Sequence, residues 1–305
     1  MTALKGIIAA VITPFRKDGS INEDEFAGLL QFLLKAGVAG MFVSGNAGEF
    51  YALSREEKLL LVRSARKALG TAAPLIFGSG CATTAETVAL TRAAEAEGAD
   101  VITLITPYLI KPSEEELYEH FASVLGATRL PVLLYNNPAV TGVSVSIKTA
   151  ERLLAFENFA GIKDSSGDLA LTLDFLRVGG DRLSVFAGRD GLILSTLIHG
   201  GAGAVSSVAS ACPELAVDIY REFAAGRLDA AREAQMKFAK LRQQFSLGTF
   251  PAVVKEILSL RGFRTGVPRL PVKPLTPENR EILSRVMRDL RLLAMTAPPR
   301  TDSPP

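Results

Sequence analysis

The feature that most constrains this 305-residue sequence is its alternation of short apolar runs with longer amphipathic stretches. The apolar runs have the length and composition of buried strands, and the stretches between them have the periodicity of helices. We expect strands at 6–11, 40–43, 75–77, 101–104, 132–135, 159–163, 183–186 and 202–205. Strands that alternate with helices in this way predict a parallel sheet that is covered on both faces.

Four of the amphipathic stretches begin with the spacing of a capping box, in which an acidic residue follows the cap by three positions. The pairs are Asn22 with Glu25, Ser54 with Glu57, Thr83 with Glu86, and Ser113 with Glu116. In such a box the cap side chain accepts from a free backbone N–H, and the acid reaches back to the N–H of the cap. These signals predict where the helices after successive strands begin.

The predicted fold class is α/β, a (β/α)8 TIM barrel with a C-terminal helical segment. Doubly wound sheets share the alternation, but eight repeats fit the barrel's usual length of about 250 residues better. No G-x-G-x-x-G motif follows the first strand, which weakens a dinucleotide-binding interpretation. After residue 210 only helical patterns remain, at 213–225, 227–246, 251–261 and 277–294. We therefore expect a barrel over 1–210, helices packed on it over 211–296, and a disordered tail over 297–305.

Composition excludes several classes of function. Apolar residues make up 48% and charged residues 22%, and the formal net charge is +2 without a basic run, so a nucleic-acid partner is not expected. No apolar stretch reaches the ~18 residues of a membrane span. The N-terminal apolar run is short and followed closely by Pro14 and Asp18, which fits a first strand better than a signal peptide. Cys81 and Cys212 lie far apart, so we expect a reduced, cytoplasmic protein.

Lys163 is the strongest candidate for a catalytic residue, because it ends an apolar strand where barrel enzymes place their reactive groups. Desolvation there would lower its pKa and give a free amine able to attack a carbonyl. The alternative is a lysine paired with Asp164 or Glu49, or turned to solvent, and for the lysine taken alone this alternative is favoured. Tyr135 ends the preceding strand, so its phenol can reach the same cavity as an acid or base; its alternative is a packed ring.

Two glycine-rich segments have both a functional and a structural interpretation. The Gly45–Gly48 turn offers clustered N–H groups suited to a carboxylate, but on spacing alone a tight turn needing positive φ is favoured. Gly200–Gly203 around the last strand could hold a phosphate, although no Ser, Thr or Lys follows in phosphate-loop spacing. His120 and His199 fall in predicted helices, and no cluster has metal-ligand spacing, so we expect neither a metal site nor a Ser–His relay.

Taken together, these motifs resemble those of the dihydrodipicolinate synthase / N-acetylneuraminate lyase family over about residues 6–293. The resemblance rests on G-x-x-G-E at 45–49, TPY at 106–108, Y-N-x-P at 135–138 and GIKD-S at 161–165. It implies a class I lyase in which Lys163 forms an imine with C2 of pyruvate and Tyr135 moves protons. It implies no cofactor beyond this imine, and commonly a homotetramer built as a dimer of dimers. The substrate-binding positions that it implies are Gly45, Asn46, Ala47, Ser165, Gly188, Asp190, Val205 and Ser207.

Three departures from the family's synthases bear on the substrate. Asn46 and Ala47 stand where the synthases usually carry two threonines, and an amide cannot relay a proton as an alcohol does. Leu109 replaces a second tyrosine after TPY. Val140 replaces the arginine that holds the carboxylate of aspartate semialdehyde, and the loss of a two-pronged charged contact is not a mild change. Arg189, after the seventh strand, is the first basic side chain that could replace it.

These departures favour a lyase for a longer, hydroxylated 2-keto-3-deoxy acid, whose hydroxyl groups Asp190, Ser165 and Ser207 would contact. Those three residues could equally cap helices and turns. The first alternative is a dihydrodipicolinate synthase that condenses pyruvate with aspartate semialdehyde. The second is a non-catalytic barrel that only binds a keto acid, and the third is an enzyme that acts on a phosphorylated sugar through Gly200–Gly203.

Overall fold

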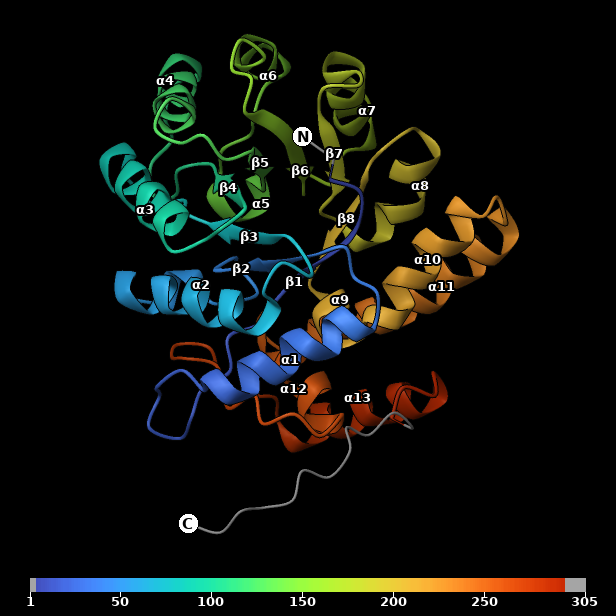
Figure 1. Cartoon of the computed structure of the whole chain (residues 1–305). Coiled ribbons are helices and arrows are strands. Elements are labelled where there is room, and N and C mark those ends of the chain that lie inside the picture. Colours follow the sequence, from blue (N-terminus) through green and yellow to red (C-terminus); the bar gives the residue numbers. More distant parts are fainter. Residues whose placement is uncertain (1–3, 294–305) are drawn as a thin grey trace.

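Eight parallel strands form a closed barrel in a computed structural model that describes residues 4–293 (Figure 1). The predicted tail at 297–305 lies outside the described residues. The strands are β1 (Gly6–Ala10), β2 (Gly40–Val43), β3 (Leu75–Gly78), β4 (Val101–Ile105), β5 (Val132–Asn136), β6 (Phe159–Asp164), β7 (Ser184–Ala187) and β8 (Gly203–Ser206). Each strand pairs with its neighbours in sequence, and β8 closes on β1. The predicted (β/α)8 barrel is therefore confirmed.

Helices follow the strands and surround the barrel (Figure 1). The helices and short 3-10 turns of the barrel are α1 (Glu23–Lys35), η1 (Phe50–Ala52), α2 (Arg55–Leu69), α3 (Thr84–Ala96), α4 (Glu114–Leu125), α5 (Pro138–Thr141), α6 (Ile147–Leu153), α7 (Leu169–Gly179), η2 (Asp190–Leu192) and α8 (Ile193–Ile198). His120 lies within α4 as expected, whereas His199 follows the end of α8. The strands are almost wholly buried, as expected for a parallel sheet that is covered on both faces.

The four predicted capping boxes form only in part. Ser54 and Ser113 make complete boxes, with the acid three residues later accepting from the N–H of the cap. Asn22 and Thr83 accept from the expected backbone N–H but have no reciprocal bond in the structure. At Thr83 the hydroxyl donates to the carboxylate of Glu86, 3.1 Å away, and occupies the acid that would have reached back.

After β8 the chain is helical, with α9 (Val208–Ala211), α10 (Pro213–Ala224), α11 (Leu228–Gln243), η3 (Gln244–Leu247), α12 (Ala252–Leu260) and α13 (Pro277–Asp289). Thr276 caps α13 and Pro277 is its first residue, as predicted. The predicted helix over 227–246 is shorter, because α11 ends at Gln243 and the chain turns through η3. In Figure 1, α10 and α11 lie side by side against the barrel, and α12 and α13 lie beneath α1.

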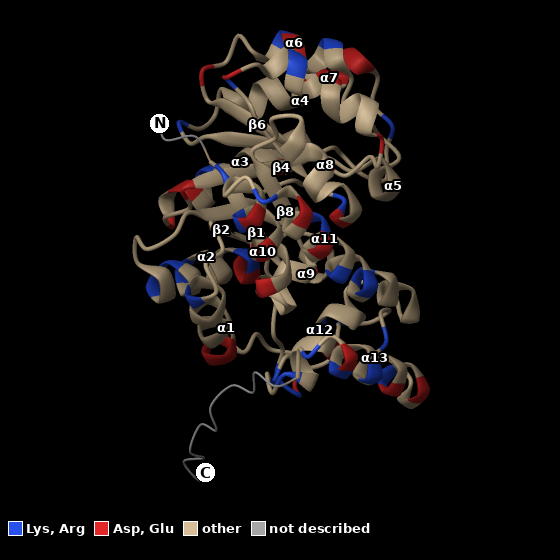
Figure 2. Ribbon diagram, turned by 90° about the vertical axis from the view of Figure 1, so that its right-hand side faces the viewer, with Lys and Arg blue, Asp and Glu red and all other residues tan. Residues whose placement is uncertain are grey.

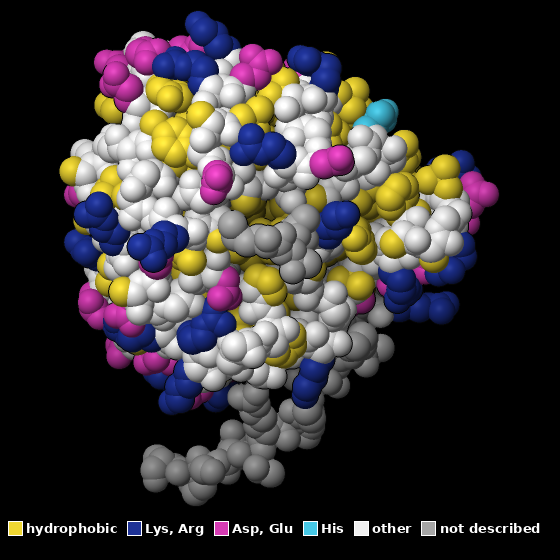
Figure 3. Space-filling view, turned by 45° about the horizontal axis from the view of Figure 1, so that its top comes forward, with side chains coloured by type: hydrophobic (Ala, Val, Ile, Leu, Met, Phe, Trp, Pro, Cys, Tyr) yellow, Lys and Arg dark blue, Asp and Glu magenta, His cyan; other side chains and the backbone are white. Residues whose placement is uncertain are grey.

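Basic and acidic residues both occur on the outer helices, for example along α6, α7 and α13 (Figure 2). On the face shown in Figure 3, basic and acidic side chains alternate and no continuous basic stripe is visible. This distribution gives no electrostatic track for a nucleic-acid backbone on that face. Within residues 4–293 no helix has both the length and the apolar character needed to cross a membrane.

The glycines at 200–203 have a structural role. Gly203 begins β8, so this segment lies at the end of the barrel opposite the carboxyl ends of the strands. A Cβ on Gly203 would lie 1.9 Å from the carbonyl oxygen of Gly6, and one on Gly201 would lie 2.7 Å from that of Thr196. The glycines therefore let β8 approach β1 and α8 closely. The suggestion that this segment holds a phosphate was wrong, and the phosphorylated-sugar alternative loses its basis.

Buried His120 predicts a loss of stability in mild acid. Its Nδ1 atom lies 2.9 Å from the hydroxyl of Thr84, its Nε2 atom has no partner among the described residues, and burial lowers its pKa to about 4. As the pH falls below the unfolded pKa of about 6.5, the unfolded chain takes up a proton that the folded chain refuses. The free energy of unfolding then decreases, by up to about 3 kcal/mol near pH 4.

Urea unfolding between pH 7 and 5 measures this effect. The free energy of unfolding of His120→Gln should decline less steeply with falling pH than that of the parent chain. Exposed His199→Gln is the control, and equal slopes for all three proteins would contradict the assignment.

Candidate active site

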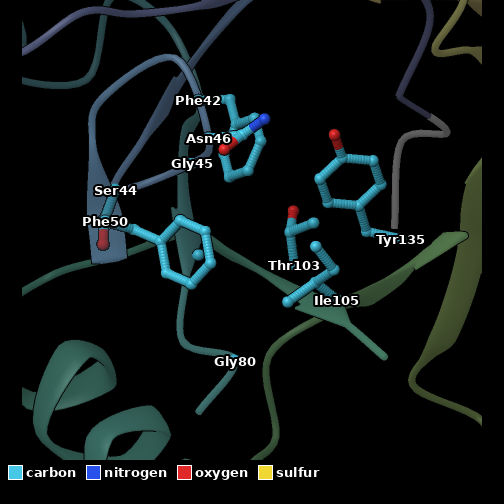
Figure 4. Close-up of a pocket in the computed structure, with 10 residues that line it drawn as sticks. Phe42, Ser44, Gly45, Asn46, Phe50, Gly80, Thr103, Ile105 and Tyr135 are labelled. Carbon is cyan, nitrogen blue, oxygen red and sulfur yellow. The ribbon is translucent and has the colours of Figure 1, made fainter. Parts of the chain in front are cut away.

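A cavity of about 370 Å³ opens at the carboxyl ends of the strands. Its walls come from the loops after β2, β5 and β7, from the ends of β5, β6 and β8, and from α11 with the chain that follows it. Nine of the predicted site residues line it: Asn46, Ala47, Tyr135, Lys163, Ser165, Gly188, Asp190, Val205 and Ser207. Gly45, the tenth, lines a small neighbouring pocket beside Tyr135 (Figure 4).

Lys163 is buried in the wall of this cavity, with 5% of its surface exposed. Its Nζ atom lies 3.7 Å from the centre of the Tyr135 ring and 5.1 Å from that of Phe42. No carboxylate within residues 4–293 forms an ion pair with it. The amine therefore faces the cavity from between two aromatic rings and makes no ion pair of its own.

The two carboxylates that could have paired with Lys163 are engaged elsewhere. Glu49 forms an ion pair with buried Lys255, 2.6 Å apart, and accepts from the backbone N–H of Arg269. Asp164 accepts from Asn136 at 2.8 Å and from the hydroxyl of Thr172 at 2.6 Å. The alternative from the sequence, in which Lys163 forms a structural ion pair with Asp164 or Glu49, is therefore wrong.

Tyr135 and Lys163 are direct partners in the register between β5 and β6, which brings their side chains to the same cavity. The phenol oxygen accepts a hydrogen bond of 2.9 Å from the side-chain amide of Asn137. Figure 4 shows the other side of the ring, where Phe42, Phe50, Thr103 and Ile105 line the small pocket. Asn137 is a contact that the sequence analysis missed, although its position two residues after Tyr135 could have indicated it.

The turn at 44–49 contributes two residues to the cavity wall, Asn46 and Ala47. Their backbone N–H groups bond to no carbonyl or side chain within residues 4–293. The positive φ angles occur at Ser44 (55°) and Glu49 (58°), so the expectation that the glycines supply them was wrong. Gly45 is required instead by close packing, since a Cβ there would lie 2.6 Å from the ring of Phe42. Free N–H groups of this kind suit a carboxylate.

The three polar groups expected to contact substrate hydroxyls differ in their availability. Ser165 is buried, and its hydroxyl has no partner among the described residues. Ser207 lines the cavity at the end of β8. The carboxylate of Asp190 is already engaged, since it accepts from Ser206 at 2.7 Å and forms an ion pair with Arg242 at 2.9 Å. Burial raises the pKa of Asp190, and the bond from Ser206 and the charge of Arg242 oppose that rise.

Gly188 and Val205 both line the cavity. A Cβ on Gly188 would lie 2.0 Å from the hydroxyl oxygen of Ser165 and 2.8 Å from the carbonyl oxygen of Asp164, so only glycine fits there. Val205 lies in β8 and is buried, with its register partner Ile8 in β1. Gly188 therefore packs directly against Ser165, and Val205 supplies part of the cavity wall from β8.

Part of the wall comes from residues that the sequence analysis did not assign to the site. Arg242, Phe245, Ser246 and Phe250 come from the end of α11 and the chain after it, and Val140 and Ala139 come from the segment after β5. Arg189 also lines the cavity, and its Nε donates to the carbonyl of Ser165 at 2.9 Å. No motif marks the residues of the α11 end, because their part in the site depends on how that helix packs on the barrel. Among the described residues, no group of three or more His, Cys, Asp or Glu side chains is arranged to hold a metal ion.

The model of the dihydrodipicolinate synthetase family matches residues 3–290. The chain belongs to this family. It is 36% identical to 4-hydroxy-tetrahydrodipicolinate synthase of Moorella thermoacetica over 287 residues, which cover 94% of this chain and 98% of the relative. It is 35% identical to the synthase of the same name from Bacillus velezensis, over 93% of this chain and 98% of the relative. The chain is accordingly a lyase of the class I aldolase type.

Solved structures of the family superimpose closely on the barrel. A dihydrodipicolinate synthase from Bacillus anthracis matches with a TM-score of 0.92 and 32% identity, covering 94% of this chain and 99% of that one. YagE, a prophage protein of the same family from E. coli K12, was solved in complex with pyruvate and matches with a TM-score of 0.91 and 32% identity over 94% and 99% of the two chains. The names of the curated relatives favour the synthase alternative over the sugar-acid lyase that the departures suggested.

Proposed function

We propose that this family member condenses pyruvate with aspartate semialdehyde, as a 4-hydroxy-tetrahydrodipicolinate synthase. The observation that carries the chemistry is the buried amine of Lys163, which packs against the ring of Tyr135 in an open cavity and forms no ion pair within residues 4–293. The names of the relatives in Moorella thermoacetica and Bacillus velezensis support the choice of the aldehyde.

In the proposed reaction, Nζ of Lys163 attacks C2 of pyruvate and forms a carbinolamine. Loss of water then gives an imine whose protonated form draws electrons from C3. Loss of a C3 proton yields an enamine, which attacks the aldehyde carbon and forms the new C–C bond, while the aldehyde oxygen takes up a proton and becomes a hydroxyl. The amino group of the aldehyde substrate then attacks C2 and displaces Nζ of Lys163, which closes the ring and regenerates the free amine. The N–H groups of Asn46 and Ala47 hold the pyruvate carboxylate, and Tyr135 carries protons to and from the carbinolamine oxygen. No dissociable cofactor is needed, because the imine is the electron sink.

A second candidate is the cleavage or dehydration of a hydroxylated 2-keto-3-deoxy acid. The unpartnered hydroxyl of Ser165 favours it, as do Asn46 and Val140 in place of the synthases' hydroxyl and guanidinium. Against it, Asp190 is engaged by Ser206 and Arg242 and is not free to bind sugar hydroxyls. A barrel that only binds a keto acid is the third possibility.

We expect aspartate semialdehyde to be condensed at least about tenfold more efficiently, in kcat/KM, than any hydroxylated 2-keto-3-deoxy acid is cleaved, since one well-matched charged contact has about this effect. The measurement follows both reactions on one preparation, with saturating pyruvate in the condensation. Efficient turnover of a sugar acid with no condensation would contradict the synthase assignment. No turnover of either class, with an imine still formed, would support the binding-only alternative.

We further propose a homotetramer in a reducing, cytoplasmic compartment. The family resemblance supports the tetramer, and so do the exposed apolar side chains of Tyr51, Leu109 and Ile110; Leu109 is 91% exposed. Cys81 and Cys212 are both free thiols, which is the usual state of cysteines in a reducing compartment.

A further inference from the structure

Arg242 brings a guanidinium to the active-site cavity from outside the barrel. It lies in the last turn of α11, lines the cavity and keeps 38% of its side chain exposed. Its Nε forms the ion pair with Asp190, while its guanidinium carbon lies 4.4 Å from the centre of the Phe245 ring. The guanidinium is thus held on one edge by a buried carboxylate and on one face by an aromatic ring.

The other edge of this guanidinium is open for a ligand. An arginine carries five N–H donors in a planar fork, and the ion pair with Asp190 uses the Nε side. Within residues 4–293 the two terminal nitrogens of Arg242 have no other carboxylate and no carbonyl as a partner. A planar fork with its terminal donors free, on the wall of a cavity, is suited to a carboxylate.

The charges of the cavity wall also favour an acidic second substrate. The wall holds three basic side chains, Lys163, Arg189 and Arg242, and one acidic side chain, Asp190. The carboxylate of pyruvate balances the charge of a Lys163 iminium, and Asp190 balances Arg242. The charge of Arg189 then remains, so the loaded cavity keeps a net positive charge, which favours an acidic second substrate.

We propose that Arg242 is a specificity-determining residue that binds the carboxylate of the aldehyde substrate through its terminal guanidinium nitrogens. The inference rests on the proposed condensation and deepens it by naming the group that selects an acidic aldehyde. Asp190 and Phe245 position the guanidinium, and Val140, which lines the same cavity, contributes no charge. An aldehyde without a carboxylate gains nothing from this contact.

The first test compares Arg242→Gln with Lys240→Gln, which removes one positive charge from an exposed position on the same helix. We expect Arg242→Gln to lower kcat/KM for aspartate semialdehyde by roughly 10- to 100-fold, mainly through KM, as for a lost charged hydrogen bond. Turnover of propanal, which has no carboxylate, should change less than about threefold. Lys240→Gln should match the parent chain with both aldehydes. An equal loss with both aldehydes, or no loss with either, would overturn the proposal.

A second measurement separates this proposal from the synthase assignment. Borohydride locks pyruvate onto Lys163, and the locked protein is titrated with butyrate and with butanamide, its uncharged counterpart. The parent chain should bind butyrate about tenfold more tightly than butanamide, and Arg242→Gln should lose that preference. If the preference persists in Arg242→Gln, the proposal is wrong. A different result would separate the two proposals: the preference for butyrate is lost in Arg242→Gln, but the parent chain does not condense aspartate semialdehyde. The carboxylate-binding role of Arg242 would then be supported, and the synthase assignment would be wrong.

Removal of Arg242 leaves Asp190 buried without its counter-charge, which could by itself weaken the fold. The double variant Asp190→Asn/Arg242→Gln removes both charges and avoids that cost. It should form the pyruvate imine as the parent chain does and still show no preference for butyrate. Retention of the preference in the double variant would also contradict the proposal.

Discussion

Lys163→Ala should form no borohydride-reducible adduct with pyruvate and should lose kcat on the order of 10⁶-fold, the loss seen when another enzyme's covalent nucleophile is removed. The reason is that the imine is the only electron sink in the proposed reaction, and no second amine lines the cavity within residues 4–293. The measurement is condensation activity together with the intact mass after borohydride treatment. The cavity wall should otherwise persist, because the removed chain contacts aromatic rings that can close over a small space.

Lys255 provides the matched control, because it is a second deeply buried lysine and pairs with Glu49 in the turn after β2. Burial lowers its pKa to about 8, which would also make it a nucleophile, although its pairing with Glu49 opposes the shift. It does not line the cavity, so Lys255→Arg should trap pyruvate as the parent chain does. An adduct that maps to Lys255 would show that the wrong lysine was assigned.

Tyr135→Phe should lower kcat by about 10²- to 10⁴-fold, the usual span for the loss of one positioned acid–base group. Nζ of Lys163 lies over the face of the Tyr135 ring, and the side-chain amide of Asn137 donates to the phenol oxygen. The change removes only a hydroxyl, so the ring should keep its packing against Phe42 and the thermal unfolding midpoint should move little. Pyruvate binding should also survive, because the backbone N–H groups at 46 and 47 are unchanged.

Tyr118→Phe is the control for this variant, since Tyr118 lies on α4 and stacks on Arg152 away from the cavity. Its activity should stay within about threefold of the parent chain. An unchanged kcat in Tyr135→Phe would mean that water or the substrate itself carries the proton. The role given to Tyr135 would then be wrong, while the role of Lys163 would stand.

Much of the barrel was predictable because its strands have their own local signals. Buried parallel strands appear as continuous apolar runs. Ser54 and Ser113 mark helix starts because each contacts an acidic residue only three positions later in the sequence. The placement of Lys163 beside Tyr135 followed from a general rule, since the carboxyl ends of neighbouring strands meet at one end of the barrel. These features depend on short-range sequence and on topology.

What could not be predicted depends on how distant segments pack. Arg242 reaches the cavity only because α11 docks against the barrel, and no motif in α11 marks that contact. Asp190 looked like a free ligand in sequence, but its partners Ser206 and Arg242 come from other elements. The roles of two glycines were misjudged because they depend on neighbours that are close in space. Gly45 is required by the ring of Phe42, and Gly203 is required by the backbone of Gly6.

The most direct test of the central claim is to incubate the protein with pyruvate, reduce with borohydride and map the modified peptide by mass spectrometry. We predict the mass increase of one reduced pyruvate per chain, carried by the peptide that contains Lys163 and absent from Lys163→Ala. An unmodified chain, or a modification on any other lysine, would contradict the imine mechanism for this protein.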